Sequence, residues 1–355
     1  MTRSFNNIQR CGFLKENRII SFLIILTLVA LGCSPETVPT SPPITNPGPT
    51  IPDLDLPIGS RNFMVGTAGL IPPHFPNSSE DDYLEFLAEV PRTGEVLGVY
   101  MDWAAPDVIE SIGFADAYAE GLIPVVALGF DFEIVDDTYF SRNLPEIRNT
   151  FRDVLETYEL DYLAFGVEVN RLIPEVSQAS FQDFVIAYRD IYDLVKFHSP
   201  ETKVFTIFQL EYLKGAALLS GLEFEPHWDV LDQFEGKQDL VGLTIYPFLE
   251  YTSVDSIPPD YYDEIPEKID LPIAITEMAW LSEDVVIVEG SEGDQVSFLL
   301  DILEQTRNWD LEMMMYSFLY EPRGVDLFES AALKTFDGKA KEVYLYWLAL
   351  VALDQ

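Results

Sequence analysis

Short apolar segments of strand length alternate with amphipathic segments of helical period from about residue 62 to the end of the chain. Each apolar run is almost continuous, as expected for a parallel strand that is covered on both faces. This alternation is typical of α/β folds, in which a helix follows each strand. A closed (β/α)8 TIM barrel requires eight strands. Eight are predicted, at 62–68, 96–101, 123–129, 162–168, 203–209, 240–246, 272–277 and 312–319.

Helix boundary signals fit the same pattern. Ser78 and Ser79 precede EDDYLEFLAEV, which places a cap and several acids at a helix N-terminus. Pro106 is predicted to open a helix that Gly121 closes, and Asn143 to precede a helix with proline in its first turn. Apolar residues also recur at helical spacing within 181–197, 295–309 and 343–353, whereas 212–236 is irregular and leaves room for one short additional helix.

The N-terminal part of the chain has the composition of an export signal followed by a tether. Residues 1–33 contain a basic region, the apolar run Ile19–Leu31 and a small-residue ending at Cys33. The ending Ala-Leu-Gly-Cys resembles the lipobox of bacterial lipoproteins, in which the cysteine becomes lipidated; an ordinary cleaved signal is the alternative. Residues 34–58 are rich in proline and threonine, which favours an extended tether. The expected location is therefore the bacterial cell envelope, with the membrane as a partner through a lipid on Cys33.

Residues 59–355 are predicted to form a single domain without disulfides, because the only cysteines are Cys11 and Cys33. The sequence has 60 acidic and 21 basic residues and a formal net charge of −39, which disfavours nucleic acids and polyanionic glycans and favours a neutral substrate. Adaptation to salty surroundings explains the charge equally well. No HExxH, CxxC or phosphate-binding glycine loop is present, so no metal, nucleotide or other cofactor is predicted. The domain is expected to be a monomer.

Two carboxylates end predicted strands. Glu168 follows the apolar run Tyr162–Val167, and Glu277 follows Leu271–Thr276. Either glutamate alone would more often be a cap or an ion-pair partner. Together, on the fourth and seventh strands, they are predicted to lie at the same C-terminal face of the barrel. Two opposed carboxylates are the working groups of a glycosidase.

Three motifs carry a resemblance to a known family. They are Gly166–Asn170 (GVEVN), Asp239–Pro247 (DLVGLTIYP), and Glu277 followed three residues later by Trp280. In order and position they resemble clan A glycoside hydrolases, most closely family 53, the endo-β-1,4-galactanases. The resemblance implies a TIM barrel, an acid/base role for Glu168 and a nucleophile role for Glu277. It further implies a retaining hydrolase of neutral β-linked galactan or arabinogalactan, with the two carboxyl groups about 5–5.5 Å apart.

One position departs from the pattern. The clan has an asparagine before the acid/base, where it bonds the sugar 2-hydroxyl, and this chain has Val167. The departure leaves open a second interpretation, a surface glycan-binding lipoprotein with little or no turnover. The resemblance also suggests that Tyr246 contacts the nucleophile. The other candidates for sugar contacts, each with core packing or a structural role as the alternative, are Asn170, Trp103, Trp280, Asp102 and Gln209.

Overall fold

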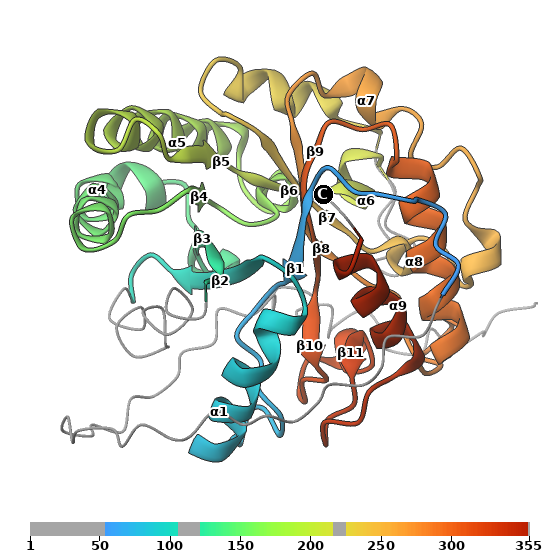
Figure 1. The fold of residues 1–355 in the computed structure, drawn as a ribbon. Coiled ribbons are helices and arrows are strands. Elements are labelled where there is room, and N and C mark those ends of the chain that lie inside the picture. The colour runs from blue at the N-terminus through green and yellow to red at the C-terminus, as the bar shows by residue number, and fades with distance from the viewer. Residues whose placement is uncertain (1–53, 106–120, 216–224, 354–355) are drawn as a thin grey trace, which may run out of the picture.

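The computed structural model describes residues 54–105, 121–215 and 225–353. Its main element is one sheet of nine parallel strands in the order β5-β4-β3-β2-β1-β9-β8-β7-β6. Figure 1 shows β1 and β9 in the middle of the molecule with helices on both sides. The strands are β1 (Met64–Thr67), β2 (Val96–Asp102), β3 (Ile123–Gly129), β4 (Tyr162–Phe165), β5 (Lys203–Phe205), β6 (Ile207–Gln209), β7 (Val241–Ile245), β8 (Ile273–Met278) and β9 (Leu311–Tyr316).

The sheet closes on itself because its two terminal strands belong to one segment. β5 and β6 are separated only by Thr206. The amide of Ile207 donates to the carbonyl of Gly166 at 3.2 Å, and the amide of Gly242 donates to the carbonyl of Thr206 at 3.1 Å. The predicted strand 203–209 therefore occupies one position in the barrel, between β4 and β7. Eight strand positions result, which confirms the predicted (β/α)8 TIM barrel.

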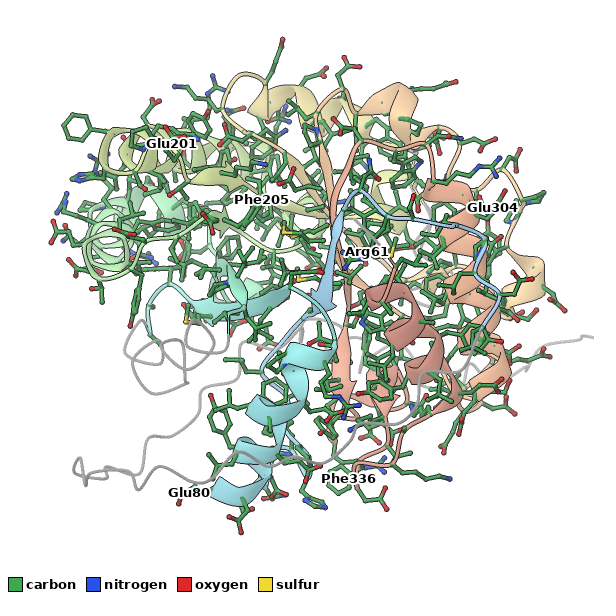
Figure 2. All side chains as sticks on the ribbon, in the orientation of Figure 1. Arg61, Glu80, Glu201, Phe205, Glu304 and Phe336 are labelled. Atoms are coloured by element: carbon green, nitrogen blue, oxygen red, sulfur yellow. The ribbon has the colours of Figure 1, made fainter. Side chains whose placement is uncertain are left out.

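Side chains alternate between the barrel interior and the layer under the helices. The interior is filled by small and medium apolar groups, with Phe205 and Tyr162 as its large members. A larger buried cluster fills the space between strands and helices. In Figure 2, Glu80, Glu201 and Glu304 lie on the outside of the molecule. The interior cluster consists of Ala68, Val96, Val125, Ala127, Tyr162, Ala164, Phe205, Ile207, Leu240, Ala274, Met313 and Met315.

Helices α4 and α5 cover one side of the barrel, and α8 and α9 cover the other (Figure 1). Ser79 caps α1 as predicted, and its hydroxyl accepts from the amide of Asp82 at 3.2 Å. The helices are α1 (Glu80–Glu89), α4 (Tyr139–Thr157), α5 (Gln178–His198), α6 (Leu210–Leu213), α7 (Ile265–Lys268), α8 (Glu292–Thr306) and α9 (Glu342–Val351). The 3₁₀ turns are η1 (Val90–Arg92), η2 (Phe132–Ile134), η3 (Val169–Leu172), η5 (Trp228–Phe234), η6 (Pro247–Leu249), η7 (Val254–Ser256) and η8 (Asp326–Phe328).

The start of α4 corrects the sequence prediction. The helix begins at Tyr139, ahead of Asn143, so that Pro145 lies inside the helix instead of in its first turn. A proline inside a helix costs about 3 kcal/mol. Tyr139 and Phe140 are buried against the Phe130 ring, and burying two aromatic side chains contributes about the same amount in the opposite sense. Packing of the first turn thus outweighs the proline signal.

Three other predictions differ in detail. The predicted strand 312–319 is interrupted after Tyr316, and its continuation β10 (Phe318–Tyr320) pairs in parallel with a strand not predicted, β11 (Ala332–Lys334). The irregular stretch 212–236 contains η5, and α6 lies at its beginning. The helix predicted between Pro106 and Gly121 lies almost wholly outside the described residues.

The export signal, Cys33 and most of the tether also lie outside the described residues, so lipidation stays a prediction. Within residues 54–105, 121–215 and 225–353, no helix has the length and apolar character needed to span a bilayer.

Candidate active site

Glu168 lies just beyond β4, at a sharp change of backbone direction. The strand ends at Phe165, three residues earlier than predicted, because Gly166 has φ 86° and Glu168 has φ 53°. Both values fall in the left-handed region, which is unfavourable for a residue with a Cβ atom. Glu168 is 1% exposed, and the turn η3 begins directly after it. The strained turn places the carboxyl group at the C-terminal end of the barrel.

Gly166→Ala is expected to lower the free energy of unfolding by about 2–4 kcal/mol, combining left-handed strain with overpacking. A Cβ at this position would lie 2.4 Å from Val169 Cγ1 and 2.9 Å from Phe184 Cζ. Gly236→Ala is the matched control, since Gly236 has φ 70° with nothing within 4 Å of a Cβ, and only the strain of about 1–2 kcal/mol should remain. Urea denaturation compares the two; equal losses would contradict the steric argument.

Glu277 reaches the barrel interior through a β-bulge. In the pairing of β7 with β8, Leu243 pairs with Ile275, but the next residue of β7, Thr244, pairs with Glu277. Thr276 is therefore an extra residue in β8. Because side chains alternate faces along a strand, one inserted residue turns every later side chain to the opposite face. Ile275 faces the helices, and without the bulge Glu277 would face them too.

Both carboxylates are held by β7 and the residue that follows it. The Thr244 hydroxyl donates to Glu168 Oε1 at 2.8 Å. One residue beyond the end of β7, the Tyr246 hydroxyl donates to Glu277 Oε2 and lies 2.8 Å from Ser317 Oγ. This short segment thus positions two carboxylates that come from β8 and from the turn after β4, and Tyr246 makes the contact that the resemblance suggested.

Glu168 also has a cationic partner, which sequence reasoning missed. Arg171 Nη1 forms an ion pair with Glu168 Oε2, and both side chains are at least nine-tenths buried. The guanidinium lies 5.6 Å from the centre of the Phe132 ring and 5.9 Å from that of Tyr212. Arg171 follows Glu168 by three residues, so a tight turn here would have predicted the ion pair. The sequence analysis predicted a strand that continues to Glu168 instead.

Glu277 lies in a different electrostatic environment. Burial, together with the nearby charge of Glu168, raises the pKa of Glu277 to about 8, although hydrogen bonds from Tyr246 and Tyr100 partly oppose the rise. Glu277 Oε1 is buried without a hydrogen-bond partner among the described residues. At neutral pH the free protein therefore holds a proton on Glu277 most of the time.

A third buried carboxyl group, on Glu211, was not predicted. Its Oε1 accepts from the amide of Tyr246 at 3.0 Å, and its Oε2 accepts from the side-chain amide of Gln209. Burial is the main cause that raises the pKa of Glu211 to about 8, with smaller contributions from the charges of Glu250 and Glu168. Glu211 lies at the start of α6, two residues beyond the predicted strand 203–209 and just ahead of the irregular stretch 212–236.

Two predicted sugar contacts, Asn170 and Gln209, are used to join strand ends. Asn170 Nδ2 donates to the carbonyl of Gln209 at 2.9 Å, and its Oδ1 accepts from the amide of Gln209 at 2.8 Å. The side chain of Gln209 caps α6 through the amide of Tyr212 and donates to Glu211. Both residues are buried, at 0% and 1% exposure. Their observed contacts position the turn after β4 relative to β6.

The tryptophans and Asp102 are also placed by the structure. Trp280 is 0% exposed, packs near Phe298, and donates its indole N–H to a backbone carbonyl at 3.1 Å. Trp103 is 5% exposed and donates to the Tyr139 hydroxyl at 3.0 Å. These contacts match the core-packing alternative. Asp102 is half-buried at the end of β2, and burial raises its pKa; a sugar contact for it stays a prediction.

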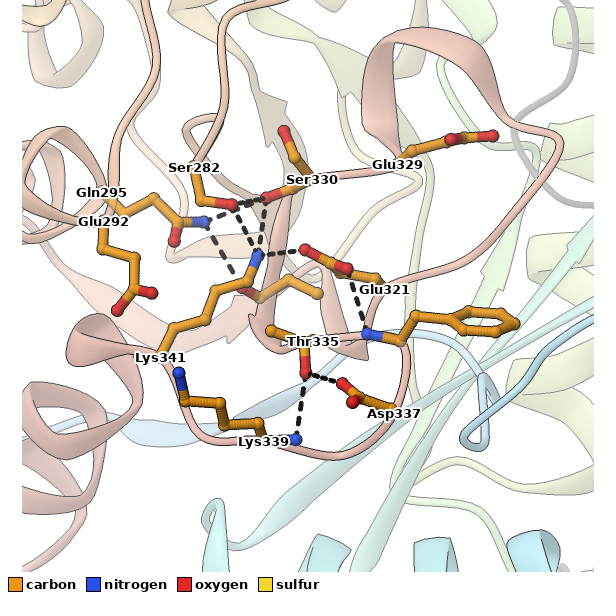
Figure 3. Close-up of polar contacts among 12 residues, drawn as sticks. Ser282, Glu292, Gln295, Glu321, Glu329, Ser330, Thr335, Asp337, Lys339 and Lys341 are labelled. Carbon is orange, nitrogen blue, oxygen red and sulfur yellow. Dashed lines mark hydrogen bonds and ion pairs between the residues drawn. The ribbon is translucent and has the colours of Figure 1, made fainter.

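A buried polar network fixes the backbone just beyond Glu277 (Figure 3). The ammonium group of Lys341 donates to the Ser282 hydroxyl at 2.8 Å and pairs with Glu321 at 2.8 Å. Gln295 donates to the carbonyl of Trp280 at 2.9 Å. Burial lowers the pKa of Lys341. Within the part of the chain that the structure describes, no three His, Cys, Asp or Glu side chains are grouped to hold a metal ion.

Comparison with known proteins gives a fold and no sequence family. No family model matches the chain, and no curated protein matches its sequence. A β-glucosidase from Exiguobacterium marinum has a similar structure, with a TM-score of 0.57, 12% identity, and coverage of 82% of this chain and 97% of that one. A family 1 β-glucosidase from Thermotoga maritima is similar with a TM-score of 0.59 and 10% identity, covering 83% of this chain and 98% of that one. The family 53 catalytic domain from Ignisphaera aggregans is similar with a TM-score of 0.56 and 15% identity, covering 85% of this chain and 98% of that one. At these identities the likeness establishes the barrel.

Proposed function

We propose that this protein is a retaining glycoside hydrolase that acts on a neutral β-linked polysaccharide. The observation that carries the proposal is the placement of Glu168, in the turn after β4, and Glu277, in β8: these two buried carboxyl groups bond to the hydroxyls of Thr244 on β7 and of Tyr246 just beyond it. Glycosidases of similar fold, among them a family 53 domain, support it. The mechanism requires the two carboxyl groups to lie about 5–5.5 Å apart.

The chemistry is a double displacement. Glu168 donates its proton to the leaving oxygen while the Glu277 carboxylate attacks the anomeric carbon, forming a glycosyl ester. Glu168, now ionised, takes a proton from water, and the water oxygen displaces Glu277 from the sugar. The reaction starts from the form in which Glu277 is ionised and Glu168 carries the proton. The pair must therefore hold one proton, and it loses this proton above about pH 8, so we expect activity to fall as the pH rises past that value.

The proposed substrate and location rest on the net charge, the sequence motifs and the N-terminal segment, and not on the barrel fold. The formal charge of −39 disfavours an acidic glycan. The three motifs that resemble family 53 favour galactan or arabinogalactan. A lipid on Cys33 would hold the domain at the cell envelope, with residues 34–58 as the tether. Both carboxyl groups are 1% exposed, so a sugar ring that contacts them must displace side chains that cover them.

The test is release of reducing ends from a panel of neutral β-glycans that includes galactan, arabinogalactan and β-glucans. Turnover on at least one member is expected, and proton NMR should show the β-anomer of the product first. Early appearance of the α-anomer would exclude the glycosyl ester. Binding without release on every member would favour the glycan-binding lipoprotein instead.

Val167→Asn is expected to raise kcat/KM on a substrate that has a 2-hydroxyl group, because an amide here can bond that hydroxyl in the transition state. Val167 is half-buried and packs on the interior cluster, so stability should change by less than the cost of about 1–3 kcal/mol for a fully buried, unpaired amide. Val167→Thr, similar in volume but without an amide, is the control. Lower stability with no kinetic gain would show that the site has been reshaped around valine.

A further inference from the structure

Tyr100 lies close to the proposed site but belongs to a different strand from the residues that contact Glu168 and Glu277 in the preceding sections. It is on β2, half-buried, and its ring packs on the barrel interior cluster. Its hydroxyl donates to the carbonyl of Thr276 at 2.9 Å. Sequence analysis passed over Tyr100 because it lies inside an apolar strand, where a tyrosine is usually a packing residue.

The carbonyl that Tyr100 contacts belongs to the bulge. Thr276 is the extra residue of β8, and the bulge turns Glu277 into the barrel. A second bond, from the Thr276 hydroxyl to the carbonyl of Leu243 at 3.2 Å, holds the same residue from the β7 side. The bulge is therefore tied to its neighbour β7 and also to β2, which is separated from β8 in the sheet by β1 and β9.

The Tyr100 hydroxyl is also within reach of Glu277 itself. The phenol has one proton, which the Thr276 carbonyl accepts in this structure; turned toward Glu277, the same O–H would favour the charged carboxylate and lower the pKa of Glu277, opposing the effect of burial. Burial and the charge of Glu277 hold the pKa of Tyr100 well above its ordinary value, so the phenol remains a donor. The other ionisable groups around Glu277 are Tyr246, just beyond β7, and Glu168, which lies beyond β4 and is paired with Arg171.

We propose that Tyr100 is a positioning residue that anchors the bulge presenting Glu277 and stabilises the Glu277 carboxylate when it forms. The proposal rests on the proposed function only for its effect on turnover; its effect on the carboxyl group is independent of any substrate. Two phenols then flank Glu277, the fully buried Tyr246 and the half-buried Tyr100.

The titration of Glu277 tests the proposal without a substrate. The C=O band of the protonated carboxyl group is followed by infrared difference spectroscopy against pH, with Glu277→Gln identifying the band. In Tyr100→Phe the midpoint should rise by about one pH unit, since one donor to the carboxylate is lost. Tyr188→Phe, which removes a buried hydroxyl without a hydrogen-bond partner among the described residues, should leave the midpoint unchanged. An unchanged midpoint in Tyr100→Phe overturns the proposal.

A second substitution gives an opposite expectation and keeps the ring and hydroxyl in place. Incorporating 3-fluorotyrosine at position 100 makes the phenol a stronger donor, so the Glu277 midpoint should fall. If Tyr100 only fills space, both substitutions change the melting temperature and neither moves the midpoint, which refutes the inference. If Tyr100→Phe does not fold, the fluorotyrosine variant alone tests whether Tyr100 affects the Glu277 midpoint.

Kinetics then separate this inference from the proposed function. With an active glycan, Tyr100→Phe should lower kcat about tenfold at pH 7, leave KM nearly unchanged, and move the alkaline limb of the pH–activity profile upward together with the Glu277 midpoint. A fall in kcat without any shift of the alkaline limb contradicts the proposal. If the wild-type protein hydrolyses no glycan but the Glu277 midpoint shifts as expected, the hydrolase proposal fails and the positioning role of Tyr100 stands.

Discussion

Glu277→Ala is expected to reduce glycan hydrolysis below detection, because no other described group is placed to form the glycosyl ester. Glu168→Ala should lower kcat about 10²–10⁴-fold on a natural glycan, the usual contribution of a general acid. The loss should be much smaller for an aryl glycoside with an acidic leaving group, which needs no proton. The measurements are reducing-end release and aryl release for both variants.

Rescue by azide distinguishes the two roles. Added to Glu277→Ala with an activated β-aryl glycoside, azide should replace the missing nucleophile and give the α-glycosyl azide. Added to Glu168→Ala, it should intercept the glycosyl ester on Glu277 and give the β-glycosyl azide. Glu201→Ala, which changes a carboxylate on the outer surface, is the control and should behave as wild type. Exchange of the two azide products would reverse the assignment of Glu168 and Glu277.

The free energy of unfolding is expected to fall as the pH rises from about 4.5 to about 8. Glu277 and Glu211 have ordinary pKa values of 4.5 and are raised to about 8 in the folded protein. Between these values the folded state binds more protons than the unfolded state, so stability declines with increasing pH. Below pH 4.5 both groups are protonated in either state and contribute nothing. The slope is at most about 1.4 kcal/mol per pH unit for each group.

Glutamine variants test the source of this slope. Glu277→Gln and Glu211→Gln should each flatten the decline measured by urea denaturation at pH 5, 6, 7 and 8, and the double variant should remove most of it. Glu304→Gln, at an exposed position on α8, is the control and should keep the wild-type slope. A stability that rises across this range in wild type would mean that neither carboxyl group is protonated in the folded protein.

Strand periodicity was enough to predict the barrel, because a fully covered parallel strand needs a continuous apolar run and most runs were bounded by helix signals. The segment 203–209 was predicted as one strand and occupies one barrel position, although a break at Thr206 divides it. The start of α4 was wrong because proline gives a local signal, whereas the burial of Tyr139 and Phe140 depends on residues far along the chain.

The barrel and the two candidate carboxylates could be predicted from the sequence, because an apolar strand and the polar residue that ends it are local patterns. The orientation of the two carboxyl groups depends on contacts across the barrel. The bulge at Thr276, the Arg171 partner of Glu168, the buried Glu211 and the contact of Tyr100 all depend on register and on distances across the barrel. A strand pattern read from sequence assumes strict alternation. One inserted residue reverses the face of every later side chain, and no local signal records it.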